Sequence, residues 1–231
     1  MTELAQEEFE VYAVKDEAKL RIILKKYPDS IVLANLNDGM KDPAWEEWIR
    51  GVMGKPETGG VAIGVIAYET DEALKKKYTE EIKVKCGFTA MKADTGAVIK
   101  SLLAALSTVN AKGRRKFLRA VTENETNITV NFPINGTYVV GIIRDISVVG
   151  FSCTFTEDPN LTKNSLFNDL QIRLQTQLLK AEGIVFGSRM DGEQKTYVVL
   201  FSQRVDPEVR TKIRKYIQSC LQGKMDNELN S

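Results

Sequence analysis

The stretch NITVNFPINGTYVVGIIRDISVVGFSCTF, residues 127–155, decides the fold of the second half of the chain. Apolar and polar residues alternate on both sides of Asn135-Gly136, as they do in strands with one buried face. An Asn-Gly pair strongly favours a tight two-residue hairpin turn, because such turns need positive φ angles. The stretch therefore predicts an antiparallel hairpin, followed by a third strand at 150–155.

Short strands continue through the rest of the second half. Further strands are predicted at 170–179, 182–189 and 195–203, with Asp191-Gly192 as a turn. About six short strands with little helix predict a small antiparallel barrel, which removes its strand edges by closing. A final helix over 206–222 begins at Asp206-Pro207, a favourable N-cap and first position. Its apolar stripe, expected to lie against the barrel, is Val209, Ile213, Ile217 and Leu221.

The first half of the chain alternates between strands and helices. Strands are predicted at 9–14, 30–36, 61–68 and 87–92, and helices at 16–28, 42–53, 70–82 and 95–111. Thr70 is the expected N-cap of the third helix. Strict alternation implies parallel pairing with right-handed crossovers. We therefore predict a small three-layer α/β domain over residues 1–111 and an all-β domain over residues 112–225.

Composition excludes several classes of function. The 231 residues carry a formal net charge of +1, so no global field attracts nucleic acid or an anionic membrane. The chain has no histidine, which excludes Ser-His-Asp and Cys-His nucleophiles and histidine-bound zinc. With no long apolar run and an acidic start, we expect a cytoplasmic protein without membrane insertion, metal or cofactor. Because the three cysteines are widely spaced, we expect them to be free thiols in a reducing compartment; they are Cys86, Cys153 and Cys220.

A local basic segment contrasts with this neutral background. The stretch AKGRRKFLRA, residues 111–120, carries five cations: Lys112, Arg114, Arg115, Lys116 and Arg119. Arg115 and Arg119 are spaced as R-x-x-x-R. Further on, RDISVVG places Asp145, Ser147 and Gly150 as D-x-S-x-x-G, where the chain turns and re-enters the sheet.

These two motifs in this order, within a β-rich context, resemble the PilZ domain over about residues 112–222. The PilZ family binds the bacterial second messenger cyclic di-GMP. The resemblance implies a six-stranded barrel with a C-terminal helix. It also implies that the ligand is held by Arg115, Arg119, Asp145, Ser147 and Gly150.

The chemistry of these residues suits such a ligand. An arginine fork can bind a phosphate through two hydrogen bonds, or lie on a purine face. A carboxylate such as Asp145 can accept from both N1–H and N2–H of guanine, and Ser147 can donate or accept nearby. Gly150 allows a close backbone approach and φ angles closed to other residues. Each residue also has a structural reading: solvated surface charge for the arginines, and turn formation for Asp145, Ser147 and Gly150.

Arg114 extends the arginine pair. In the PilZ family, the residue before the first motif arginine influences whether one ligand or a stacked pair is held. An arginine at this position could stack on an additional guanine. The resemblance therefore suggests that Arg114 joins the ligand-binding set and that a stacked dimer of the dinucleotide binds.

The first domain resembles a receiver domain more loosely. Asp38 stands near the phosphoacceptor position, Thr70 near the hydroxyl position and Lys92 near the lysine position. The clustered carboxylates that hold Mg²⁺ in phosphoryl transfer are not evident, since only Asp16 and Glu17 follow the first predicted strand. We therefore expect a degenerate, phosphate-independent module. Core packing is the default interpretation of Trp45 and Trp48, with a docking face as the alternative.

The leading hypothesis is a non-enzymatic cyclic di-GMP receptor. Ligand would order the arginine segment, change the relative orientation of the two domains and so signal to a protein partner, in motility, adhesion or a related behaviour. The alternative is a nucleic-acid-binding regulator that uses residues 112–119, with Phe117 stacking on a base. An enzyme has little support, although paired-carboxylate chemistry stays open because Asp and Glu are plentiful but unpatterned.

Overall fold

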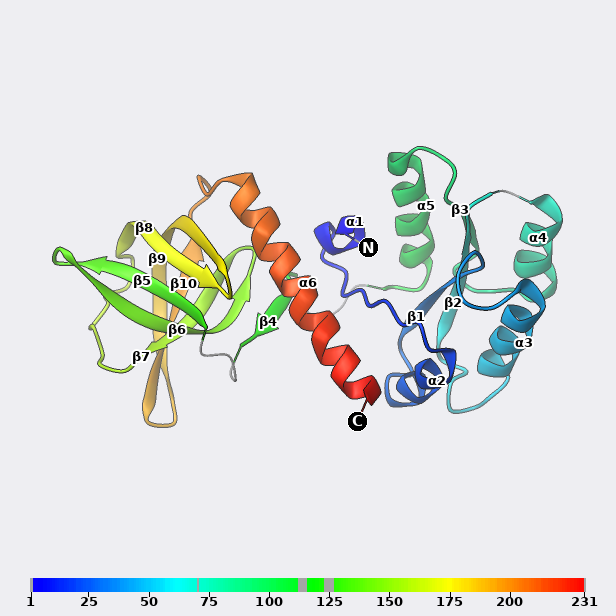
Figure 1. The fold of residues 1–231 in the computed structure, drawn as a ribbon, viewed down its shortest axis with the longest axis horizontal. Helices are drawn as coiled ribbons and strands as arrows, with labels where there is room; N and C mark the ends of the chain where they lie inside the picture. The colour runs from blue at the N-terminus through cyan, green and yellow to red at the C-terminus, as the bar shows by residue number, and fades with distance from the viewer. Residues whose placement is uncertain (1, 70, 112–115, 123–126, 231) are drawn as a thin grey trace. The chain divides into compact units, whose positions relative to one another are not determined.

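The computed structural model describes residues 2–69, 71–111, 116–122 and 127–230. The chain forms two compact units: Met1–Tyr12 with Arg115–Met225, and Ala13–Arg114 with Asp226–Ser231 (Figure 1). We call the first of these the barrel unit and the second the α/β unit. The domain limits 1–111 and 112–225 stay a prediction. The two units differ from these limits at the N-terminus, because Met1–Tyr12 packs with the second half of the chain.

The α/β unit is built on a three-stranded parallel sheet with the order β1-β2-β3. Its strands are β1 (Ile31–Asn35), β2 (Ala62–Ala67) and β3 (Phe88–Ala90). Its helices are α2 (Glu17–Lys26), α3 (Asp42–Met53), α4 (Glu72–Lys76) and α5 (Thr95–Thr108), with one π-helical turn, η1 (Lys77–Glu81). Because α3 and α5 lie on opposite sides of the sheet, the predicted three-layer α/β architecture is confirmed (Figure 1).

Two details of the predicted α/β unit need correction. The strand predicted at 9–14 is not formed, so the sheet has three strands rather than four. Phe9 and Val11, the apolar residues that suggested it, instead line a small cavity within the barrel unit. The N-cap of α4 is Asp71, whose carboxylate accepts hydrogen bonds from the amides of Ala73 and Leu74. Thr70, the predicted cap, lies outside the described residues.

Trp45 and Trp48 belong to the core of the α/β unit. Both side chains are buried, and their rings meet edge to face with centroids 5.7 Å apart. Each indole N–H donates to a backbone carbonyl, that of Asp38 for Trp45 and that of Glu17 for Trp48. Core packing, the default interpretation, is therefore confirmed for both tryptophans.

The receiver-like positions lie after the strands of this sheet. Asp38 follows β1, and its carboxylate accepts from the amide of Gly39 at 3.0 Å. Lys92 follows β3 and pairs with Glu69 at 2.8 Å. Asp16 caps α2. Among the residues that the structure describes, no group of three or more His, Cys, Asp or Glu is placed to hold a metal ion. The likeness to receivers thus rests on a parallel sheet with flanking helices.

The barrel unit contains a closed antiparallel barrel. Its sheet has the order β4-β6-β5-β8-β9-β10-β7, and β7 also pairs with β6, which closes six strands into the predicted barrel. β4 pairs with the last residues of β6, beyond the part of β6 that pairs with β5. The strands are β4 (Arg119–Val121), β5 (Ile128–Ile134), β6 (Thr137–Ser147), β7 (Gly150–Phe155), β8 (Leu166–Leu174), β9 (Gln177–Asp191) and β10 (Gln194–Phe201).

Two hairpins of the barrel test the sequence analysis. Asn135 and Gly136 have φ angles of 49° and 81°, and Ile134 pairs with Thr137, which confirms the predicted two-residue turn. The single strand predicted at 170–179 is wrong, because β8 ends at Leu174 and β9 begins at Gln177. In the turn between them, Gln175 has a φ of 55°. Glutamine is uncommon at positive φ, and no glycine or asparagine in the sequence indicated a turn here.

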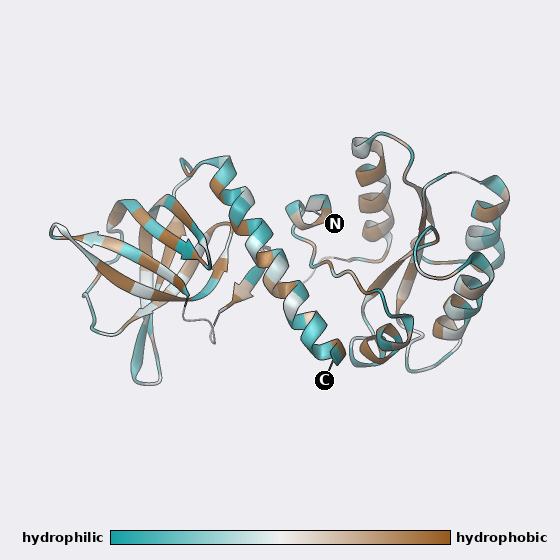
Figure 2. Cartoon of the chain, in the orientation of Figure 1, coloured by the Kyte–Doolittle hydropathy of each residue, from teal (hydrophilic) through white to brown (hydrophobic). Residues whose placement is uncertain are grey.

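Aromatic residues and the last helix complete the barrel core. Phe132 is fully buried, with ring centroids 5.0 Å from Phe167 and 5.4 Å from Phe155. Helix α6 (Pro207–Asn230) alternates between hydrophobic and hydrophilic patches (Figure 2). Two of its hydrophobic side chains, Ile213 and Ile217, are buried. It extends beyond the predicted end at residue 222.

Within the described ranges, no helix combines the length and apolar character needed to cross a membrane. The free thiols Cys86 and Cys153 are buried, and Cys220 is half-buried.

A polar cluster joins α3 to η1 in the α/β unit. Tyr78 is fully buried, and its hydroxyl donates to Asp42 Oδ1 at 2.6 Å. Lys77 Nζ lies 2.8 Å from Asp42 Oδ2 and 2.7 Å from Glu46 Oε2. Burial opposes ionisation of Asp42, but the hydrogen bonds from Lys77 and Tyr78 outweigh it and hold the pKa of Asp42 below its usual range.

We expect Tyr78→Phe to lower the free energy of unfolding by about 1.5 kcal/mol, because it removes a hydrogen bond to a charged acceptor. Urea titration at neutral pH measures the loss, and Tyr68→Phe, at an exposed tyrosine, is the matched control. Because the pKa of folded Asp42 is lowered, the stabilisation is present above the ordinary aspartate range and disappears as pH falls through the folded value. A difference that grows on acidification would contradict this account.

Candidate functional site

A β-bulge in β6 sets the direction of the D-x-S-x-x-G segment. The register against β7 shifts between Ile143 and Asp145, so Arg144 is the extra residue. Ile143 and Ile146 are both fully buried although they are three residues apart. In a regular strand, residues three apart face opposite sides. The bulge therefore directs two consecutive side chains, Arg144 and Asp145, to the outside of the barrel.

Asp145 lies between β4 and β7, where it contacts a side chain on each neighbouring strand. On β7, the hydroxyl of Ser152 donates to Asp145 Oδ2. On β4, Arg119 Nη1 lies 3.4 Å from Asp145 Oδ1, a long contact at the weak end of hydrogen bonding. The Arg119 side chain is 48% exposed, and that of Asp145 is 22% exposed. Among the described residues, Arg119 of the first motif and Asp145 of the second thus meet on one outer face of the barrel.

Arg119 is carried by a strand. It belongs to the basic segment, for which no strand was predicted, but it is the first residue of β4 and pairs with Ser147. The short strand escaped prediction because three residues give no clear alternation. Phe117, the proposed base-stacking residue of the nucleic-acid alternative, packs partly against the barrel core. Arg114 and Arg115, the other two arginines of the predicted site, lie outside the described residues.

Ser147 shapes the turn between β6 and β7. Its side chain is buried, and its hydroxyl donates to the carbonyl of Gly150 at 3.1 Å and accepts from the amide of Val149 at 3.4 Å. These contacts match the turn-forming role considered for serine in the sequence analysis. Contact of Ser147 with a ligand stays a prediction.

Gly150 is required by close packing. A Cβ at this position would lie 2.2 Å from the carbonyl oxygen of Val199 and 3.0 Å from the Cα of Leu200, both on β10. In this structure the close backbone approach at Gly150 is that of β10, and the approach of a ligand stays a prediction. The expected φ is wrong, because Gly150 is not among the glycines with positive φ.

Arg144 belongs to the same face and was missed by the sequence analysis. Its Nε donates to Thr154 Oγ1 at 2.9 Å and its Nη2 to Gln194 Oε1 at 3.0 Å. It therefore ties β6 to β7 and β10 on the outside of the barrel. The signal in the sequence was the spacing of Ile143 and Ile146, which breaks the period of two and reveals the bulge.

The site continues sideways into an apolar surface. Directly paired residues of antiparallel strands share a face. Leu200 and Ile184 are each 39% exposed and Leu166 is 56% exposed. One cross-strand row therefore leads from a cation through the turn residues to exposed aliphatic side chains; its members, in order, are Arg119, Ser147, Gly150, Leu200, Ile184 and Leu166.

Comparison with protein families matches residues 113–219 to the PilZ domain. This part of the chain is a PilZ domain, in agreement with the resemblance drawn from its two motifs. The match covers the barrel and most of α6, and leaves the α/β unit outside it. No curated protein matches the chain.

Solved structures of low sequence identity are similar to about half of the chain. The PilZ domain with c-di-GMP of YcgR from Escherichia coli is 12% identical, with a TM-score of 0.42, and the match covers 50% of this chain and 97% of that one. The MrkH–c-di-GMP complex of K. pneumonia is 18% identical, with a TM-score of 0.44 and coverage of 51% and 57%. The inhibitor of motility MotI/DgrA of Bacillus subtilis is 15% identical, with a TM-score of 0.38 and coverage of 50% and 53%. The chain thus spans little more than half the length of the MrkH and MotI chains.

The packing of Gly150 yields a test of the fold of the site. We expect Gly150→Ala to lower the free energy of unfolding by about 3 kcal/mol, because the added methyl group would overlap the backbone of β10. Urea titration measures this loss. The control is Gly187→Ala on β9, where an added Cβ meets nothing within 4 Å and the change should stay within about 0.5 kcal/mol. Equal stabilities of the two variants would refute the steric explanation.

Proposed function

We propose that this chain is a non-enzymatic receptor for cyclic di-GMP. The observation that carries the proposal is the meeting of Arg119 and Asp145, which come from the two sequence motifs and lie 3.4 Å apart on adjacent strands. The PilZ match over residues 113–219 supports the same ligand, because the family binds this messenger. The ligand-binding residues proposed are Arg114, Arg115, Arg119, Asp145, Ser147 and Gly150.

Asp145 is the proposed acceptor for guanine. A carboxylate has room for about four hydrogen bonds, and its partners among the described residues are Ser152 and Arg119. It can therefore accept from the N1–H and N2–H of a guanine while Ser152 stays bound. The long contact to Arg119 is the one that the ligand would replace.

Arg119 is the proposed phosphate or base ligand from β4. Its guanidinium is half exposed and held by a 3.4 Å contact, so turning it toward a phosphate costs little. Arg115 and Arg114 would add two further forks. Together they would neutralise the two phosphates or cover a purine face.

The apolar part of the cross-strand row suits the rest of the ligand. Leu200 and Ile184 continue the row beyond Gly150 and are partly exposed. A flat purine presents an apolar face and polar edges. Such a base can cover these leucine and isoleucine side chains while its edges reach the polar end of the row.

The signal would follow from the position of the arginine segment in the chain. The α/β unit ends at Arg114 and the barrel unit resumes at Arg115. A ligand bound by these arginines would favour the arrangement that brings them to Asp145 and Ser147. The relative orientation of the two units would then change and be read by a protein partner, in motility, adhesion or a related behaviour.

Isothermal titration with cyclic di-GMP tests the proposal. We expect Arg119→Ala and Asp145→Ala each to weaken binding by at least about tenfold, because each removes a charged hydrogen-bonding group. Arg173→Ala, at an exposed arginine on β8, is the matched control and should bind like the wild type. A wild type without affinity for cyclic di-GMP would refute the receptor assignment. Binding of RNA or DNA oligonucleotides that collapses steeply with salt would support the nucleic-acid alternative instead.

The stoichiometry of that titration tests the role of Arg114. If Arg114 stacks on an additional guanine, the wild type binds two molecules of cyclic di-GMP per chain and Arg114→Leu binds one. Lys116→Leu removes a neighbouring cation outside the proposed ligand set, and should leave the stoichiometry unchanged. One molecule per chain in both the wild type and Arg114→Leu would reject the stacked dimer and leave the receptor assignment in place.

A further inference from the structure

Glu8 occupies a backbone position that normally favours glycine. The amide of Phe9 donates to the carbonyl of Leu4 at 3.0 Å, and the amide of Glu8 donates to that of Ala5 at 3.2 Å. This pair of bonds is the Schellman arrangement that ends a helix, here α1 (Thr2–Gln6). Glu8 is its left-handed residue, with a φ of 63°. A glutamate here is strained relative to glycine, so its side chain should have a compensating role.

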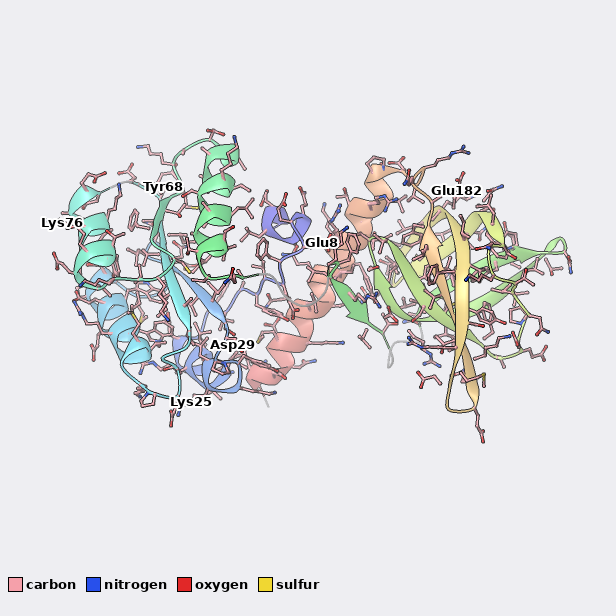
Figure 3. All side chains as sticks on the ribbon, turned by 180° about the vertical axis from the view of Figure 1, so that it is seen from behind. Glu8, Lys25, Asp29, Tyr68, Lys76 and Glu182 are labelled. Atoms are coloured by element: carbon pink, nitrogen blue, oxygen red, sulfur yellow. The ribbon has the colours of Figure 1, made fainter. Side chains whose placement is uncertain are left out.

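The side chain of Glu8 connects two distant segments of the barrel unit. Figure 3 labels Glu8, close to α6. Its Oε2 accepts a hydrogen bond from the amide of Leu118 at 2.8 Å, and its Oε1 lies 3.7 Å from Nε of Arg214 on α6. The Glu8 side chain is only 17% exposed. It borders a small cavity that is otherwise largely apolar, lined among others by Phe9, Val11, Ile217 and Leu221. A hydrogen bond to a carboxylate gains strength in such surroundings.

Leu118 immediately precedes Arg119, the first residue of β4. β4 has three residues, stands at the end of the sheet order and, among the described strands, pairs with β6 alone. Short edge strands open easily, because few contacts hold them. Glu8 fixes the backbone where this strand begins. It therefore restricts the position of Arg119 opposite Ser147 and beside Asp145.

We propose that Glu8 is a positioning residue for the cyclic dinucleotide site, acting through Leu118 on Arg119. This inference rests on the proposed receptor function. Glu8 touches no ligand in this scheme; it holds β4 in place before the ligand arrives, and so removes an ordering cost from binding.

Glycine at position 8 separates this positioning role from a purely structural one. Glu8→Gly relieves the backbone but removes the carboxylate, so we expect cyclic di-GMP to bind about tenfold more weakly while the thermal midpoint is not substantially lowered. Glu8→Gln keeps an oxygen that can accept from Leu118 and should bind close to the wild type. Glu7→Ala, at an exposed neighbouring carboxylate, is the matched control. Calorimetry well below the thermal midpoint gives the affinities.

A double-mutant cycle with Arg119→Ala identifies the route of the effect. If Glu8 acts through Arg119, Glu8→Gly weakens binding much less in the Arg119→Ala background than in the wild type. An equal loss in both backgrounds overturns the inference, as does unchanged or tighter binding by Glu8→Gly alone; in both cases wild-type binding keeps the receptor assignment. A wild type that does not bind cyclic di-GMP removes the receptor assignment and this inference together.

Discussion

The pairing of β7 with β10 in the closed barrel is the constraint on which the candidate site depends. The two strands pair from Gly150–Leu200 to Thr154–Thr196, and the first pair fits only because Gly150 has no side chain. The same glycine closes the turn from β6, where its carbonyl accepts from Ser147. One residue therefore joins β10, β7 and β6 at a single level of the barrel. The D-x-S-x-x-G segment is fixed by the fold before any ligand is considered.

The bulge in β6 turns this rigid frame into a polar surface. An uninterrupted strand would have directed either Arg144 or Asp145 into a core of aromatic rings, where an unpaired charge is costly. The extra residue keeps Ile143 and Ile146 inside and places both charged neighbours outside. The two arginines on this face then differ in how firmly they are held. Arg144 donates to Thr154 and Gln194, whereas Arg119, on β4, makes a long contact with Asp145 and remains half exposed.

The sequence was most informative where local chemistry and tertiary packing agree. The turn at Asn135-Gly136, the barrel strands on either side of it and the stripe of α6 follow from turn chemistry and periodicity, which tertiary packing reinforces. Apolar residues alone misled at Phe9 and Val11, because these residues line a cavity together with residues far away in sequence, among them Ile217 and Leu221 of α6. The turn at Gln175 was hidden because glutamine carries no turn signal. The motif residues could be chosen from the sequence, but the pairing of Arg119 with Ser147 could not, because it depends on a three-residue strand and a bulge.

A site whose polar groups already have partners can still bind a ligand, provided that the partners differ in strength. The hydroxyl of Ser152 and the guanidinium of Arg119 both contact Asp145, but the second contact is long and partly solvated, so its loss costs little. Meanwhile the Ser152 bond keeps the carboxylate oriented, which lowers the ordering cost of binding. In the role proposed for it, Glu8 contributes in the same way on the other side of Arg119, since it holds the backbone at Leu118 and leaves the Arg119 guanidinium able to turn. The frame is therefore fixed at the backbone and adjustable at one cation, as the proposed receptor function requires, because that function exchanges an internal ion pair for an anionic ligand.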